Sequence, residues 1–284
     1  MPITALLLLF ASASLHALWN LLLKHSREKY ITMGWMVLLG GVLSGILLLF
    51  TGLPPRSMWG YIAASVALET IYFILLSSAY TDHDFSLIYP VARGTAPAFL
   101  MIWSTVFLKE DLTRGGILGI LLIVGGMIVI GTTSLGQTQG RRVRPTGIFT
   151  ALTVALIISL YTFVDGSAVQ DGSPLPYALT MFALVPVLTT AYNLRRYGGK
   201  RFLSAWKGPR LPLVIASVLG VTAYLLALFA YTIAPVGYSG AIREMSVVIG
   251  AFLGWQYLGE EMGGRRVLGS VIIFAGILTI ALFG

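Results

Sequence analysis

The sequence contains no cysteine, and only 11% of its 284 residues are charged. The lack of cysteine excludes disulfides and thiolate metal sites. Soluble globular domains carry about 25% charged residues, whereas this chain is 57% hydrophobic with a mean hydropathy of +0.86. A soluble fold of this length has too little interior to bury so much apolar surface. We therefore expect a polytopic membrane protein.

Motifs for catalysis and for metal or nucleotide binding are also missing. The three histidines, His16, His25 and His83, lie in no metal-ligand spacing, and the chain has no Gly-x-Ser-x-Gly turn and no P-loop. We therefore expect no enzyme activity, no cofactor, no metal site and no built-in ATP motor. The formal net charge of +8 comes largely from Lys and Arg in short loops between apolar runs. This pattern indicates orientation in a bilayer, not nucleic-acid binding.

Ten apolar segments are long enough to cross a membrane, which takes roughly 20 residues. The first has no basic start and its apolar run continues to Leu23, so we expect a helix and not a cleaved signal peptide. The sequence predicts an all-α membrane protein with ten transmembrane helices, at approximately 3–23, 31–51, 58–80, 85–108, 115–135, 147–169, 174–193, 211–232, 238–258 and 266–284.

The two halves of the chain share a common register. Arg93 matches Arg243 and Glu110 matches Glu260, both at a spacing of 150, and several glycines follow the same spacing. Each repeat holds five helices, an odd number, so the second copy must enter the membrane with the opposite orientation. Inverted repeats of this kind build transporters that work by alternating access, with the substrate site near the midplane. We expect a first repeat at 1–135, a connecting loop at 136–146 and an inverted second repeat at 147–284.

The basic residues are distributed unequally between the two sides of the membrane. Fourteen Lys and Arg residues fall in the loops after the first, fifth, seventh and ninth helices, against three on the other side, Arg56, Lys109 and Arg114. The positive-inside rule places the richer side in the cytoplasm. We therefore expect an integral multi-pass protein of the bacterial cytoplasmic (inner) membrane, with both termini on the non-cytoplasmic side.

Three stretches resemble a known family. They are ALWN with Lys24 ending the first helix, SLIYPVARGTAPAFLMIWSTVFLKEDLTRGGILGILLIVGGMIVIG, and its echo GYSGAIREMSVVIGAFLGWQYLGEEMGGRRVLGSVIIFAGI. In both long stretches a helix ends in a Glu-containing turn and a Gly-rich helix follows. On these residues the whole chain resembles the EamA-type branch of the drug/metabolite transporter (DMT) superfamily.

The resemblance implies a secondary transporter or exchanger of amino acids, nucleotide sugars, other metabolites or drugs. It also implies a central cavity lined largely by the third, fourth, eighth and ninth helices, together with the first and sixth. Many members of the family have both termini in the cytoplasm, the reverse of what the charge distribution predicts here. The direction of transport is therefore not inferred from the family.

Two arginines lie inside apolar spans, at depths that the repeat makes comparable. Arg93 lies about 12 Å along the fourth span and Arg243 about 8 Å along the ninth. A charge at such depth costs at least about 2.5 kcal/mol and usually faces a partner or a wet cavity. One interpretation is a structural ion pair or a snorkelling side chain. We favour the other, in which both guanidiniums face a shared cavity and bind a carboxylate or phosphate group of the substrate.

Two acidic residues share this depth. Glu69 lies at the centre of the third span, and Glu244 directly follows Arg243. Glu69 has three interpretations: a partner for an arginine, a proton-coupling carboxylate, or a seat for a substrate amine. Two arginines and two glutamates balance, so the site suits a zwitterion as well as an anion.

Further polar and aromatic candidates surround these charges. His16, either a packed hydrogen-bonding residue or a proton relay, shares a helix face with Asn20. Asp165 lies near the end of its span, and we expect it at the membrane interface. The predicted substrate-binding residues are Arg93, Arg243, Glu69, Glu244, His16, Trp19, Asn20, Tyr72, Tyr89 and Tyr161, although tyrosine and tryptophan also form interfacial belts.

Proline and glycine predict two structural features. Pro90 and Pro97 flank Arg93 and free backbone carbonyls at membrane depth, so we expect a hinge in the fourth helix. Three Gly-x-x-x-Gly patterns predict close helix packing within the chain; they begin at Gly41, Gly115 and Gly250.

The leading functional hypothesis is a secondary transporter, proton-coupled or an exchanger, for a small anionic or zwitterionic metabolite such as an amino acid, organic acid or phosphonate. One alternative is an exporter of cationic or aromatic drugs that uses Glu69. The other is a flippase for a lipid or polyprenyl phosphate. The expected partners are a small-molecule substrate and the lipid bilayer, in a monomer or homodimer with no nucleic acid.

Overall fold

The structure is a computed structural model of the chain that describes residues 1–24, 28–82, 85–137, 145–170, 172–204, 206, 210–258 and 264–284. Within these ranges the side chains of residues 23, 24, 29, 77–82, 85–90, 131–137, 145 and 258 are outside the description. The predicted side chain of Tyr89 is therefore outside it.

The described residues fold into α-helices joined by short connections. The α-helices are α1 (Ile3–Lys24), α2 (Lys29–Thr51), α3 (Trp59–Asp82), α4 (Phe85–Phe107), α5 (Arg114–Gln137), α6 (Pro145–Gln170), α7 (Pro174–Tyr197), α8 (Gly199–Ser204), α9 (Arg210–Tyr231), α10 (Val236–Arg243), α11 (Met245–Leu258) and α12 (Gly264–Phe283). A short 3₁₀ turn, η1 (Arg56–Met58), precedes α3.

Local sequence explains where these helices begin and end. Prolines open α6 and α7, because a proline in the first turn sacrifices only an amide that has no partner within the helix. Gly52 and Gly198 follow α2 and α7 with φ of 76° and 80°, a left-handed conformation that glycine adopts at little cost. The apolar runs between such signals therefore form separate helices.

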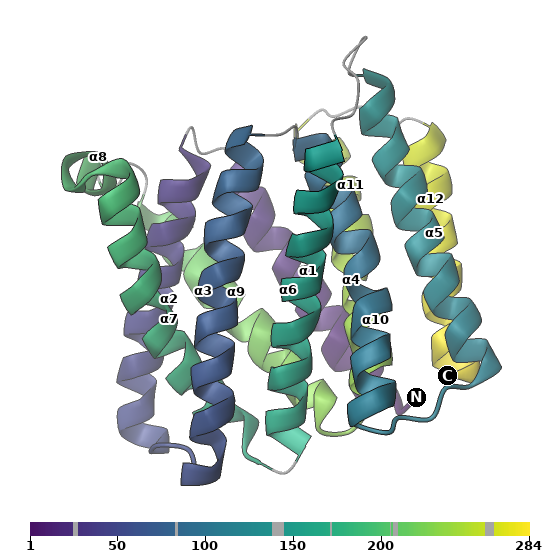
Figure 1. Cartoon of the computed structure of the whole chain (residues 1–284), viewed down its shortest axis with the longest axis horizontal. Coiled ribbons are helices and arrows are strands. Elements are labelled where there is room, and N and C mark those ends of the chain that lie inside the picture. The colour runs from purple at the N-terminus through teal and green to yellow at the C-terminus, as the bar shows by residue number, and fades with distance from the viewer. Residues whose placement is uncertain are drawn as a thin grey trace.

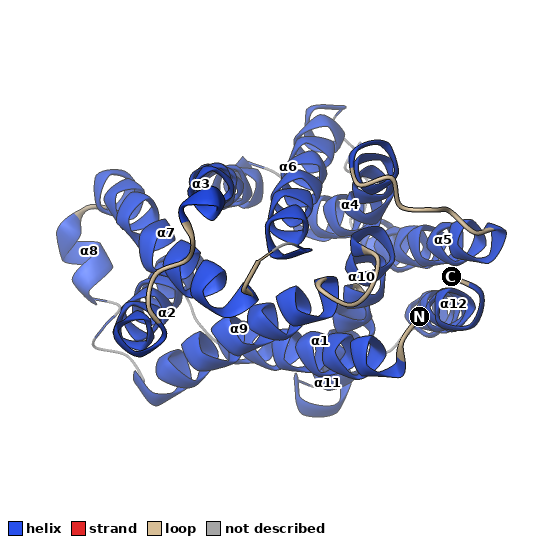
Figure 2. Ribbon diagram, turned by 90° about the horizontal axis from the view of Figure 1, so that it is seen from below, coloured by secondary structure: helices blue, strands red, loops and turns tan. Residues whose placement is uncertain are grey.

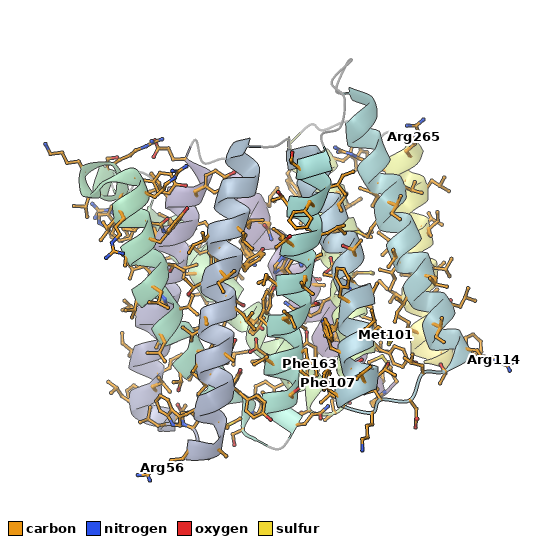
Figure 3. All side chains as sticks on the ribbon, viewed as in Figure 1. Arg56, Met101, Phe107, Arg114, Phe163 and Arg265 are labelled. Atoms are coloured by element: carbon orange, nitrogen blue, oxygen red, sulfur yellow. The ribbon has the colours of Figure 1, made fainter. Side chains whose placement is uncertain are left out.

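The helices form ten spans, because α10 and α11 together make the ninth. Among the described residues, eight helices are long and apolar enough to cross a membrane. Both termini lie at one end of the bundle (Figure 1). Arg56 and Arg114 lie at that same end, whereas Arg265 lies at the opposite, more basic end (Figure 3). The fold is thus the predicted all-α membrane protein.

The packing between helices repeats in related pairs. Helix α1 packs on α9 as α6 packs on α3, and α4 packs on α6 as α11 packs on α1. Helix α3 packs on α7 as α9 packs on α2. These pairs are related by the correspondence of α1–α5 with α6–α12, so the chain consists of two inverted five-helix repeats.

Helices α5 and α12 are corresponding members of the two repeats, and they pack side by side at one edge of the molecule (Figure 2). A Cβ atom at Gly126 would lie 2.7 Å from the carbonyl oxygen of Gly269, and one at Gly119 would lie 2.7 Å from that of Gly276. Glycine is required here because the two backbones approach this closely. The predicted close packing through Gly115-x-x-x-Gly119 therefore lies within the chain.

The ninth span is broken, and the fourth is not. Helix α10 ends at Arg243, Glu244 forms a turn, and α11 starts at Met245. Helix α4 runs without interruption past Pro97, so the structure has no break there and the hinge in the fourth helix stays a prediction. Pro97 has no backbone N–H, so the carbonyl of Arg93 lacks its usual hydrogen bond within the helix. Both residues line a cavity, and a carbonyl without a helical partner is tolerated at such a position.

The outer surface carries many large apolar side chains. Leu49 and Phe50 on α2 are each 82% exposed, and Leu282 on α12 is 71% exposed. The buried core runs through the centre of the bundle and includes Tyr177 and Tyr231. Apolar groups outside and aromatic hydroxyls inside suit a bundle surrounded by lipid.

Candidate functional site

A small cavity lies between α4, α6 and the break between α10 and α11. Helix α10 approaches α4 closely there, because a side chain at Gly240 would meet Leu100. Residues of both repeats therefore line the same cavity, from α4 in the first and from α6 and α10 in the second. Its polar lining residues are Arg93, Ser159, Tyr161, Thr162, Arg243 and Glu244.

Arg93 contacts side chains of α1 and of the break between α10 and α11. Its Nη1 donates to Glu244 Oε1 at 3.3 Å, and its Nη2 lies 2.9 Å from His16 Nε2. Because a guanidinium can only donate, His16 Nε2 is the acceptor in this contact. Arg93 thus joins α4 to α1 and to the broken helix, with its charge balanced by Glu244.

Arg243 has different surroundings, although it is the counterpart of Arg93 in the repeat. Its Nη1 donates to the hydroxyl of Tyr231 at 2.8 Å, and its guanidinium lies 5.2 Å from the centroid of the Tyr224 ring. In the described part of the chain, no carboxylate oxygen lies within ion-pair distance of Arg243. The direct contacts printed for its guanidinium are therefore with tyrosine side chains.

Asp165 is fully buried on α6, more than a turn before the helix ends. Its Oδ1 accepts a hydrogen bond from the Tyr177 hydroxyl at 2.6 Å, and its Oδ2 accepts one from Tyr224. The predicted interfacial position was wrong, because partners on α7 and α9 enclose the side chain. Through Tyr224, Asp165 also supports the ring on which Arg243 rests.

The remaining predicted residues divide into two groups. Glu69 is buried on α3 and Tyr161 lines the cavity, with its ring 5.7 Å from that of Tyr72. Trp19 packs with Met36 in an apolar cluster, and its ring also lies edge-on to that of His16, with 4.8 Å between the centroids. The side chain of Asn20 donates to the backbone of its own helix, at the His16 carbonyl.

Three tyrosines contact the buried charges; sequence reasoning missed Tyr177 and Tyr224, and considered Tyr231 as a cavity-lining residue without selecting it. All three are buried, and each donates to or accepts from a charged group. A buried tyrosine hydroxyl needs a hydrogen-bond partner. The presence of several tyrosines in apolar spans therefore indicates buried hydrogen bonds. It does not indicate which charged group each hydroxyl contacts.

Glu110 fixes the broken helix to the first repeat. Its carboxylate accepts hydrogen bonds from two backbone amides at the start of α10, those of Val236 and Gly237. The neighbouring Thr113 amide donates to the hydroxyl of Tyr238 at 3.0 Å. Free amides and the helix dipole make a helix start favourable for a carboxylate. The loop between α4 and α5 is therefore hydrogen-bonded to α10, the helix that carries Arg243.

Replacement of Glu110 by alanine is expected to destabilise the protein by about 1–2 kcal/mol, because two amides at the start of α10 lose their acceptor. Thermal unfolding in detergent, followed by tryptophan fluorescence, measures the change. Asp111→Ala is the matched control, since its side chain is exposed. Equal midpoints for the two variants would contradict a capping role.

The chain was compared with known families, curated proteins and solved structures. It matches the EamA-like transporter family over residues 3–132 and 145–282. The comparison with curated proteins finds no significant match. Among the solved structures, 28 chains match. One crystal structure has a TM-score of 0.80 over 99% of this chain and 98% of the other, at 17% sequence identity, which supports the fold alone.

The family match covers nearly all of the chain, in two parts that correspond to the two repeats. It agrees with the inverted packing of the helices and with the shared cavity between them. The chain therefore belongs to the EamA-like transporter family, and it is an integral multi-pass membrane transporter of the drug/metabolite transporter type.

Proposed function

We propose that the protein is a secondary transporter that moves a small anionic or zwitterionic metabolite by alternating access, with Arg243 binding the anionic end of the substrate. The observation that carries this proposal is the contrast between the two arginines. Arg93 is balanced by Glu244, whereas no described carboxylate pairs with Arg243. A guanidinium that keeps its charge beside a cavity is a natural receptor for a carboxylate, phosphonate or phosphate.

Glu244 extends the proposal to zwitterions. One of its oxygens accepts from Arg93, and the other, Oε2, is buried with no hydrogen-bond partner among the described residues. Both Glu244 and Arg243 line the cavity. A substrate with an ammonium group and a carboxylate would give each of them a partner.

The repeat architecture supports alternating access. The cavity lies between the halves at 1–135 and 147–284, so rocking of one half against the other would expose it to either side. The basic end of the bundle supports a cytoplasmic location for that end in a bacterial inner membrane, with both termini outside. Either proton coupling or exchange would drive such a cycle.

A thermal-shift screen of the purified protein tests the substrate class. The panel holds carboxylates, phosphonates and zwitterionic amino acids, each beside its neutral amide, together with organic amines. We expect stabilisation by anions or zwitterions and not by the amides. Arg243→Ala should weaken that binding at least about tenfold, because a hydrogen bond to a charged group is lost. Arg56→Ala, an exposed arginine at the end of the bundle, is the control.

The proposal predicts that ligand binding is weakened in Arg243→Ala and unchanged in the control Arg56→Ala. Stabilisation that survives in Arg243→Ala would refute the assigned role, as would a response to amines alone. Uptake of the best ligand into proteoliposomes then establishes transport and its direction.

A further inference from the structure

The stretch from the last turn of α7 to the start of α9, residues 195–210, is strongly basic and contains no acidic residue. It lies at the basic end of the bundle, where α8 and Arg265 are also found (Figures 1 and 3). Among the described residues, the carboxylate that contacts this stretch is that of Glu28, 3.0 Å from Arg201 Nε. The stretch therefore has a local excess of positive charge. Its exposed basic side chains are Arg195, Arg196, Lys200, Arg201 and Arg210.

Aromatic packing fixes part of this stretch against α2. The ring of Trp35 packs against those of Phe202 and Trp206, with centroids 5.0 and 4.8 Å apart. The Trp35 Nε1 also donates to the backbone carbonyl of Phe202 at 2.8 Å, and the Phe202 side chain is buried. Trp206 therefore has a defined position at the end of the bundle, with its ring only partly covered.

Arg210 rests on this aromatic cluster. Its guanidinium lies 5.1 Å from the centroid of the Trp206 ring, and its Nε donates to the Trp206 carbonyl at 3.3 Å. In the described part of the chain, no carboxylate lies within ion-pair distance of Arg210. The Nε–H is only one of the N–H donors of a guanidinium. The two terminal nitrogens therefore remain to bind an oxyanion, in the fork geometry that matches a phosphate.

An exposed apolar face continues from Arg210 along α9. Leu211, Val214 and Val218 are exposed on this helix, and their spacing of three and four residues places them on one face. Arg210 precedes Val214 by four residues, so its side chain lies at the end of the same face. A fixed cation at the end of an apolar face matches the two parts of a phospholipid, the phosphate and the acyl chain.

We propose that Arg210, Trp206 and this face of α9 form a binding site for an anionic phospholipid. The phosphate binds the Arg210 guanidinium, the acyl chain lies along Leu211, Val214 and Val218, and Trp206 lies at the level of the headgroups, as interfacial tryptophans do. Charge complementarity selects an anionic headgroup, because a zwitterionic lipid also brings a cation close to the surrounding basic side chains. Arg210 does not line the cavity between the repeats, so the site does not rest on the proposed function.

Native mass spectrometry of the purified full-length protein, released from a non-ionic detergent, tests the site. The titrations use phosphatidylglycerol and phosphatidylcholine with identical acyl chains, together with glycerol 3-phosphate as a phosphate without acyl chains. We expect the first phosphatidylglycerol to bind at least about fivefold more tightly than phosphatidylcholine, and glycerol 3-phosphate to bind far more weakly than either lipid.

Two outcomes of these titrations would overturn the proposal. Equal affinities for the two lipids would show that the headgroup charge is not recognised. Binding of glycerol 3-phosphate as tightly as phosphatidylglycerol would make a free phosphate compound, and not a lipid, the ligand of Arg210.

Matched arginine variants separate a defined site from general attraction to a basic surface. Arg210→Gln should weaken the first phosphatidylglycerol binding at least about fivefold, because the phosphate loses its cation. Arg265→Gln removes another exposed arginine at the same end of the bundle and should leave the affinity unchanged. Equal losses in the two variants would mean that only the overall charge matters, which contradicts the site.

A third variant tests the aromatic support and keeps the proposal testable if Arg210→Gln does not fold. Trp206→Leu retains every charge but removes the ring on which Arg210 rests, so phosphatidylglycerol binding should weaken about two- to fivefold. Unchanged affinity in this variant would refute the role of the aromatic cluster. Arg243→Ala should bind phosphatidylglycerol as the wild type does, so the lipid site and the substrate site are tested independently.

Discussion

Replacement of Arg93 by alanine is expected to lower the free energy of unfolding by about 3–5 kcal/mol, the usual cost of removing one partner from a buried ion pair. The Arg93 and Glu244 side chains are 14% and 5% exposed, so little water reaches the charge that remains. Glu244 already has one buried oxygen without a partner among the described residues, and this change would remove the partner of the other. Denaturant titration in detergent micelles measures the loss.

A double-mutant cycle isolates the pair. The combination of Arg93→Ala with Glu244→Gln removes both charges and should recover much of the stability lost in Arg93→Ala alone. Additive costs for the two single changes would contradict the ion pair. The same purified variants, tested against the anion panel, separate this structural role of Arg93 from the binding role proposed for Arg243.

The second large effect is expected in the pair formed by α5 and α12. Gly126→Leu should destabilise the protein by about 3 kcal/mol, because the added side chain meets the Gly269 carbonyl on the facing backbone. Backbone in a packed helix cannot rotate away as a side chain can, so the two helices must separate. The thermal midpoint reports the change.

The adjacent residue supplies a matched control. A Cβ at Gly125 would meet nothing within 4 Å, so Gly125→Leu adds the same side chain on the same helix without that contact. We expect it to be neutral or slightly stabilising, since leucine favours a helix more than glycine does. Equal losses in both variants would mean that helix contact at Gly126 is not responsible.

The sequence was sufficient to predict the helices and the repeat. Long apolar runs determine where a chain can cross a bilayer, and the spacing of 150 between Arg93 and Arg243 identified the two halves. The family resemblance was confirmed by the match over both repeats. The helix positions and the repeat depend only on the order of residues along the chain, so a single sequence is enough to predict them.

The contacts between helices could not be predicted in this way. The equivalence of Arg93 and Arg243 predicted one role for both, but one meets Glu244 and the other meets Tyr231. The position of Asp165 near a helix end predicted the interface, because nothing in α6 reveals the tyrosines of α7 and α9. Sequence gives the depth of a charge in the membrane, whereas its partner depends on how the helices pack.

The site is therefore only partly predictable. Arg93, Arg243, Glu244 and Tyr161 lie around one cavity, whereas Trp19 and Asn20 contact His16 and do not line that cavity. Their substrate-binding roles stay predictions until a ligand is found.

The break at Glu244 divides the ninth span, whereas its counterpart in the first repeat, α4, is one continuous helix. The residue that corresponds to Glu244 in the first repeat is Gly94, 150 positions earlier, and glycine is the residue that most readily leaves a helix. If the repeats exchange shapes during transport, α4 would bend at Gly94 while α10 and α11 straighten into one rod. That exchange would carry Glu244 away from Arg93 in every cycle. The ion pair would then break and re-form once in each turnover.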